Sequence, residues 1–211
     1  MARQPTYCFE PELAADTGHS SRQYWRFGLY DSFADGLAQS LMPYDLHVLG
    51  NHEFDYGTGF LKRYMESFTQ KGRHPFISGN MDFSGNSDLS SIASKTEPLV
   101  RGSFSGKKVA ESYIHRDYAS GELFGIVSAI TPLLRTISSP GTSKLTSTDI
   151  PGTAALINKQ VESLEKRGIN KIILVSHLQG FANDKEIIAL LKNVDVAIAG
   201  GGDDLLSSPA V

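Results

Sequence analysis

Residues 50–57, Gly-Asn-His-Glu-Phe-Asp-Tyr-Gly, place an amide next to an imidazole directly after a short apolar run. Asn51 offers a carbonyl oxygen of the kind that hard divalent cations bind. His52 could donate a proton or a hydrogen bond to a phosphate oxygen or to a leaving group. A plain polar turn after a strand would also explain an Asn-His pair. The residue types alone therefore leave two interpretations open, a site for metal-assisted chemistry and a structural turn.

Two further polar positions follow apolar runs late in the chain. His177 comes directly after residues 172–176, Ile-Ile-Leu-Val-Ser, and its imidazole suits zinc, manganese or iron. Asp203 follows three glycines at 200–202, and its carboxylate could supply an oxygen ligand to a cation. A histidine at a strand end is more often a structural residue, and an aspartate after glycines also fits a capped turn.

The pattern of apolar residues predicts an α/β fold that would bring these positions together. Four short apolar runs indicate buried strands, and three segments with helical spacing lie between them. In layered α/β folds, ligands bind at loops just past the carboxyl ends of strands. The predicted strands are 46–49, 75–78, 171–176 and 194–199, and the predicted helices are 60–68, 156–164 and 187–191, the last capped by Asn183 or Asp184.

The remaining segments carry turn residues. Residues 82–98 are rich in Ser, Asp and Asn and predict a surface loop. Residues 99–130 contain several strand-like stretches with turn signals, as in a meander or hairpins. Residues 131–152 hold three prolines and many Ser and Thr, which favours a long exposed connection.

The bulk composition excludes several classes of function. The chain has 211 residues, a net charge of −3 and no basic stripe, so neither nucleic acid nor an anionic membrane is an expected partner. Its single cysteine, Cys8, excludes an internal disulfide and a cysteine-based zinc site. The longest apolar runs are too short to span a bilayer, and residues 1–12 do not have the pattern of a secretory signal.

The string at 50–57 resembles, residue for residue, a signature of the 5′-nucleotidase branch of the calcineurin-like metallophosphoesterases. The order of later elements is similar too, because that family has a strand ending in a metal-binding His followed by Leu, as in His177-Leu178. A helix and a strand that ends in glycines then follow, as at 194–201. The resemblance covers about residues 13–206.

The resemblance implies a four-layer α/β/β/α sandwich that holds two divalent metal ions, from among Zn, Mn, Fe, Ca and Mg, and hydrolyses phosphate monoesters such as 5′-nucleotides. The first strand is expected to be missing. Residues 1–211 would form a single partial domain, without the C-terminal nucleotide-recognition domain. Asn51 and His177 would bind metal, His52 would be catalytic and Asn80 would contact substrate. Glu53 and Asp55 are expected to pin the loop through hydrogen bonds.

The sequence departs from the family pattern in its ligand set. No Asp-X-His precedes Asn51, and His19 stands where the family has a bridging aspartate, with Asp31 as a second candidate nearer to Asn51. A neutral imidazole cannot bridge two cations as a carboxylate can. Asp203 takes the place of the family's Gly-His-X-His. These departures leave an alternative, a catalytically impaired or truncated relative that acts as a binding module.

The expected partner is a small-molecule phosphate ester or nucleotide, and the oligomeric state stays open. Relatives are commonly periplasmic, secreted or on the cell surface, whereas this sequence carries no export signal, so its compartment stays open as well.

Overall fold

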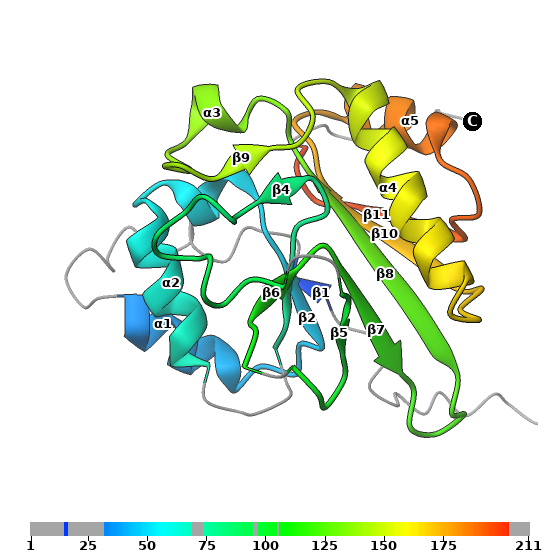
Figure 1. Cartoon of the computed structure of the whole chain (residues 1–211), viewed down its shortest axis with the longest axis horizontal. Helices are drawn as coiled ribbons and strands as arrows, with labels where there is room; N and C mark the ends of the chain where they lie inside the picture. Colours follow the sequence, from blue (N-terminus) through cyan, green and yellow to red (C-terminus); the bar gives the residue numbers. More distant parts are fainter. Residues whose placement is uncertain (1–14, 17–31, 69–73, 95–96, 105, 203–211) are drawn as a thin grey trace, which may run out of the picture.

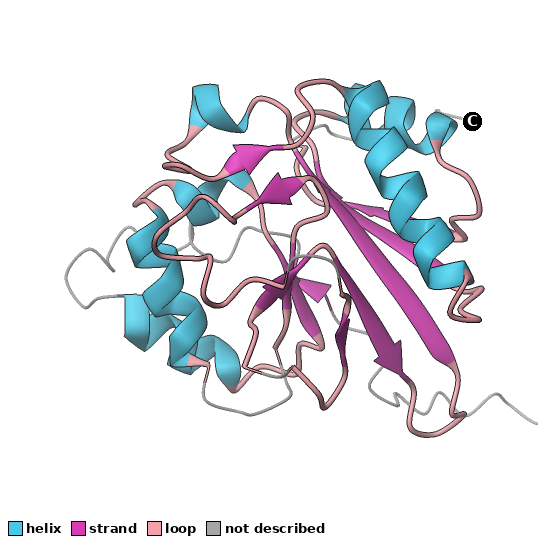
Figure 2. Ribbon diagram, in the orientation of Figure 1, coloured by secondary structure: helices cyan, strands magenta, loops and turns pink. Residues whose placement is uncertain are grey.

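The computed structural model describes residues 15–16, 32–68, 74–94, 97–104 and 106–202 of the chain (Figure 1). These residues form two larger β-sheets and one two-stranded ribbon, with helices on the outer sides (Figure 2). The predicted mixed α/β class is therefore confirmed.

The first sheet is parallel throughout, and the residue 50–57 signature follows the carboxyl end of one of its inner strands. Its strand order is β1-β2-β3-β6, and His47 lies opposite Asp16 on one side and Phe76 on the other. Two helices that contact each other, α1 and α2, belong to this half of the molecule. The bounds are β1 (Ala15–Asp16), β2 (Leu46–Val48), β3 (Phe76–Ile77), β6 (Val109–Ala110), α1 (Ser32–Ser40) and α2 (Thr58–Ser67).

The second sheet has five strands in the order β11-β10-β8-β7-β5. Strands β11, β10 and β8 are parallel, whereas β7 forms an antiparallel hairpin with β8. Helices α4 and α5 cover this half of the molecule (Figure 1). The bounds are β5 (Leu99–Val100), β7 (Ser112–Arg116), β8 (Leu123–Ile130), α4 (Ile150–Glu165), β10 (Ile172–His177), α5 (Phe181–Leu190) and β11 (Val196–Ala199).

Alternation along the strands gives the order helix, sheet, sheet, helix. In β2, Leu46 and Val48 join a cluster that also contains Val175 of β10, so this cluster lies between the two sheets. Leu49 points the other way and joins the cluster of α2. Leu174 of β10 packs in a third cluster with the apolar face of α4. Each sheet therefore buries one face against the other sheet and one face against helices.

The segments between the main strands are more structured than the sequence predicts. The segment 82–98, expected to be a surface loop, buries Phe83, Leu89 and Ile92 in the apolar cluster that also contains residues of α2. Its polar composition did not indicate that it contributes to the core. The expected exposed connection at 131–152 contains a short helix whose Leu134 is fully buried. These segments contain β4 (Met81–Asp82), α3 (Leu134–Ile137) and β9 (Lys144–Leu145), and β4 pairs with β9.

Three predictions about strands and helix ends need correction. The stretch 99–130 is not one meander, because β6 joins the first sheet while β5, β7 and β8 join the second. The alternative prediction of a hairpin is confirmed for β7 and β8. Helix α5 follows Gly180 without a side-chain cap, and Asp184 instead accepts a buried hydrogen bond from Ser176 at 2.7 Å. Strand β11, an edge strand of its sheet, was expected to be buried and is exposed at all four residues. Among the described residues, none of the helices has both the length and the apolar composition required to cross a bilayer.

Candidate active site

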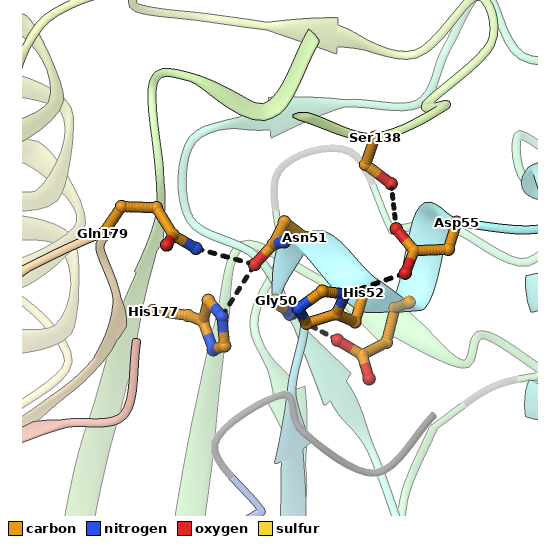
Figure 3. Close-up of polar contacts among 8 residues, drawn as sticks. Gly50, Asn51, His52, Asp55, Ser138, His177 and Gln179 are labelled. Atoms are coloured by element: carbon orange, nitrogen blue, oxygen red, sulfur yellow. Dashed lines mark hydrogen bonds and ion pairs between the residues drawn. The ribbon is translucent and has the colours of Figure 1, made fainter. Parts of the chain in front are cut away.

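The candidate site lies where strands of the two sheets end side by side. Strand β2 ends at Val48 and leads into a single 3-10 turn, η2 (Asn51–Phe54). Strand β10 ends at His177, which contacts Asn51 although the two residues are 126 positions apart (Figure 3). The predicted meeting of polar residues at the carboxyl ends of these strands is therefore present.

Glu53 fixes the shape of the signature loop. Its buried carboxylate accepts a hydrogen bond from the Gly50 N–H at 2.7 Å, which closes the turn around η2. The predicted loop-pinning role of Glu53 is thus confirmed. Gly50 itself has φ −103° and ψ −176°, an extended conformation open to any residue. The left-handed conformation falls on Gly57, whose φ of 80° favours glycine at the start of α2.

Asn51 is the polar centre of the site. Its Oδ1 accepts hydrogen bonds from His177 Nε2 and from Gln179 Nε2, each at 2.9 Å. Asn51 and His177 are both buried, with 3% and 1% of their surface exposed. Gln179 was not predicted from the sequence, although its position two residues beyond the predicted ligand His177 could have indicated it.

The glycines after β11 allow the chain to pass close behind His177. A Cβ added to Gly201 would lie 2.4 Å from the carbonyl oxygen of Leu178 and 2.8 Å from the carbonyl carbon of His177. Only glycine accommodates this approach without a shift of one of the two backbones. Gly201 therefore has a packing role beside the site.

His52 lies beside the Asn51–His177 pair and forms its hydrogen bond within a second polar group. Its Nδ1 lies 2.7 Å from Asp55 Oδ2, and Ser138 Oγ donates to Asp55 Oδ1 at 2.8 Å (Figure 3). Because a carboxylate only accepts, Nδ1 must carry the proton of the His52–Asp55 bond. The sequence assigned Asp55 to loop bonding alone, and Ser138 was not anticipated.

Asn80 is used by the neighbouring strand β8 in this structure. The residue is fully buried, its Oδ1 accepts from Ile130 N and its Nδ2 donates to Ile130 O, both at 2.9 Å. The amide thus ties the chain after β3 to the end of β8. A contact of Asn80 with substrate stays a prediction.

The described residues supply a partial set of metal ligands. Asn51 and His177 present an amide oxygen and an imidazole nitrogen, donor types that divalent cations accept, at a separation that two ligands of one ion can have. Within the described ranges, no three His, Cys, Asp or Glu side chains gather around a common point. The other two predicted ligands, His19 and Asp203, lie outside the described residues. The donor atoms of the described residues are therefore of types that bind divalent metals, but they are fewer than the ligands that one ion needs.

Comparison with known proteins gives relatives of one kind. No protein-family model matches the chain. The trifunctional nucleotide phosphoesterase protein YfkN of Bacillus subtilis is 30% identical over 187 residues, which make up 82% of this chain and 12% of that protein. The 5′-nucleotidase of Rattus norvegicus is 27% identical over 188 residues, or 89% of this chain and 28% of the relative.

Solved structures agree with these sequence relatives. A 5′-nucleotidase precursor from Thermus thermophilus superposes with a TM-score of 0.70 at 27% identity, over 90% of this chain and 32% of that one. The NAD nucleotidase of Haemophilus influenzae gives a TM-score of 0.67 at 26% identity, over 89% of this chain and 29% of that one. The chain thus spans less than a third of the length of each of these proteins. It is a relative of the 5′-nucleotidases and calcineurin-like phosphoesterases, and it corresponds to one part of those larger proteins.

Proposed function

We propose that this chain forms the metal-binding part of a hydrolase that cleaves phosphate monoesters, with 5′-nucleotides as the substrate class. The observation that carries the proposal is the contact between Asn51 and His177 beside His52, within a loop whose eight residues match a nucleotidase signature. Relatives named as 5′-nucleotidases and as a nucleotide phosphoesterase support the substrate class.

His52 is the residue we assign to proton transfer. Its Nδ1 is engaged by Asp55, and in the described part of the chain its Nε2 makes no hydrogen bond. Nε2 is therefore the ring atom that can hold a proton close to the leaving oxygen of a bound ester. A positioned acid or base of this kind contributes roughly 10²–10⁴-fold to a rate.

Asn51 and His177 are the residues we assign to a divalent ion. When bound, such an ion would activate water and offset the charge of the phosphate. An imidazole nitrogen binds metal only without its proton. The proton that His177 Nε2 donates to Asn51 in this structure would therefore have to leave that atom before an ion could bind there.

A second candidate function follows from the ligand set. Neither Asn51 nor His177 supplies a carboxylate, and His19 stands where the resemblance implies a bridging carboxylate. A relative with an incomplete site could keep the fold and bind a phosphate ester or an ion without turnover.

Metal stoichiometry and turnover together separate the two functions. We would titrate the purified chain with Mn²⁺ and assay it with p-nitrophenyl phosphate. Two ions per chain with turnover support the hydrolase, whereas one ion or none without turnover supports the binding module. His177→Ala should weaken Mn²⁺ affinity at least about tenfold, whereas His115→Gln, a buried histidine of another cluster, should not. Equal affinity in His177→Ala would make His177 a structural residue.

A further inference from the structure

We infer that Ser138 is a positioning residue of this site, because its hydroxyl holds the Asp55 carboxylate in the orientation that supports His52. The inference rests on the proposed function, since it concerns His52 as the residue that transfers a proton. The Asp55 carboxylate accepts one hydrogen bond on each oxygen and so links the two residues. Ser138 Oγ donates to Oδ1 at 2.8 Å, and His52 Nδ1 donates to Oδ2 at 2.7 Å (Figure 3).

Asp55 needs more than one partner to stay in place. Its side chain is 37% exposed, so water competes for both of its oxygens. A single hydrogen bond leaves the carboxylate free to rotate, because the torsion at its end is soft. A second bond on the opposite oxygen restricts that rotation, and Ser138 supplies it.

Ser138 is itself held by the fold. Its N–H donates to Leu134 O at 2.9 Å at the end of α3, and the next residue, Ser139, donates its N–H to Phe54 O at 3.3 Å. Leu134 is fully buried in the same apolar cluster as Phe54. The segment after α3 is therefore packed against the signature loop. It places the Ser138 hydroxyl beside Asp55, which lies 83 positions earlier in the sequence.

The expected contribution of Ser138 is to the chemical step and not to substrate affinity. The hydroxyl donates to Asp55 without removing its charge, so Asp55 continues to hold the proton on His52 Nδ1 and to leave Nε2 available. Without the hydroxyl, the productive orientation of His52 is populated less often. We expect Ser138→Ala to lower kcat roughly three- to tenfold, the effect of one lost hydrogen bond, with KM unchanged.

The choice of substrate distinguishes a loss of His52 positioning from a general loss of activity. A nucleoside monophosphate has a poor leaving group that needs a proton, whereas p-nitrophenolate leaves with little help. Ser138→Ala should therefore lower kcat on the nucleotide more than on p-nitrophenyl phosphate, and Ser138→Thr should restore it. Ser139→Ala, the same change one residue further on, is the matched control and should behave as the wild type, because the hydrogen bond of Ser139 uses its backbone.

Two results would overturn the inference in the active protein. One is a kcat for Ser138→Ala equal to that of the wild type on the nucleotide. The other is an equal loss when Ser138→Ala is added to Asp55→Ala, because a residue that acts through Asp55 should have no further effect once that carboxylate is gone.

A second measurement does not depend on turnover. The ¹⁵N chemical shifts of the His52 ring report which nitrogen carries the proton. We expect the Nδ1–H form in the wild type and in Ser139→Ala, and a larger share of the Nε2–H form in Ser138→Ala. If the chain lacks turnover but shows this shift, the proposed hydrolase activity fails and the positioning role stands. Unchanged shares of the Nδ1–H and Nε2–H forms of His52 in Ser138→Ala would contradict the positioning role.

Discussion

At the scale of single residues, Asn51 and His52 are neighbours that serve different groups. The 3-10 turn directs Asn51 toward the end of β10, where its oxygen accepts from His177 and Gln179. The His52 side chain instead forms its hydrogen bond with Asp55, through Nδ1 (Figure 3). A short string of sequence can therefore position an ion-binding oxygen and a proton-transferring ring at once.

His52→Asn tests this division of roles. Asparagine cannot transfer a proton, so we expect kcat to fall by about a hundredfold or more. Mn²⁺ affinity should stay close to that of the wild type, because in the described part of the chain no hydrogen bond joins the His52 side chain to Asn51 or His177. Tyr56→Phe, an exposed position of the same signature, is the control. Unchanged turnover in His52→Asn would remove this residue from the mechanism.

The residues of the signature could be predicted from the sequence, but their partners could not. Asn51, His52 and Glu53 lie in one local string whose types indicate their chemistry. Gln179 and Ser138 reach the site only through tertiary packing, at separations of 128 and 83 residues from the groups they contact. Common residue types carry no local signal for such contacts.

At the scale of elements, α4 is the main cover of the second sheet, and it begins earlier than its apolar spacing suggested. Asp149 caps the helix by accepting a hydrogen bond from the Gly152 N–H at 2.6 Å, and Pro151 lies in the first turn. Proline lacks the N–H that a first turn leaves unpaired, so it is well tolerated there. The proline that indicated a loop in the sequence is therefore part of the helix start.

Asp149→Ala should lower the free energy of unfolding by about 1 kcal/mol, because it removes this cap. For a chain of this size the melting temperature should fall by about 2–4 °C. Asp149→Asn keeps an accepting oxygen, so its free energy of unfolding, measured by urea titration, should fall much less. Equal losses for the two variants would show that the charge of Asp149, and not its cap, stabilises the helix.

Strand β11 shows what apolar content alone cannot predict. Its sequence, Val-Ala-Ile-Ala, indicated burial, whereas Val196 is 50% and Ile198 is 39% exposed. Apolar content indicates that side chains favour burial, and the tertiary arrangement decides whether another element covers them. Here the sheet order places β11 at an edge.

At the scale of the whole molecule, a polar cluster away from the candidate site joins the two halves. Arg101 Nη1 donates to His115 Nε2 at 3.0 Å, and Arg101 Nη2 lies 3.4 Å from Oδ1 of Asp45, just before β2. Burial lowers the pKa of His115 below its ordinary value of 6.5, and Arg101 lowers it further, against the opposing effect of Asp45. The imidazole is therefore neutral in the fold, with its proton on Nδ1.

Stability should consequently fall as the pH drops below 6.5. The unfolded chain takes up a proton on His115 in that range, whereas the folded chain resists it until its lower pKa is reached. We expect the wild type to lose more stability between pH 7.5 and 5.5 than His115→Gln, measured as urea midpoints. Asp35, whose pKa burial raises to about 6, acts in the opposite sense and is present in both proteins. Equal losses would show that His115 is not the responsible group.

The most direct measurement of the central claim is anomalous diffraction from crystals of the chain soaked in Mn²⁺. We predict a manganese peak within bonding distance of both Asn51 Oδ1 and His177 Nε2, which would join the ends of β2 and β10 through one ion. A peak elsewhere, or an Asn51–His177 hydrogen bond that persists at saturating Mn²⁺, would contradict the account.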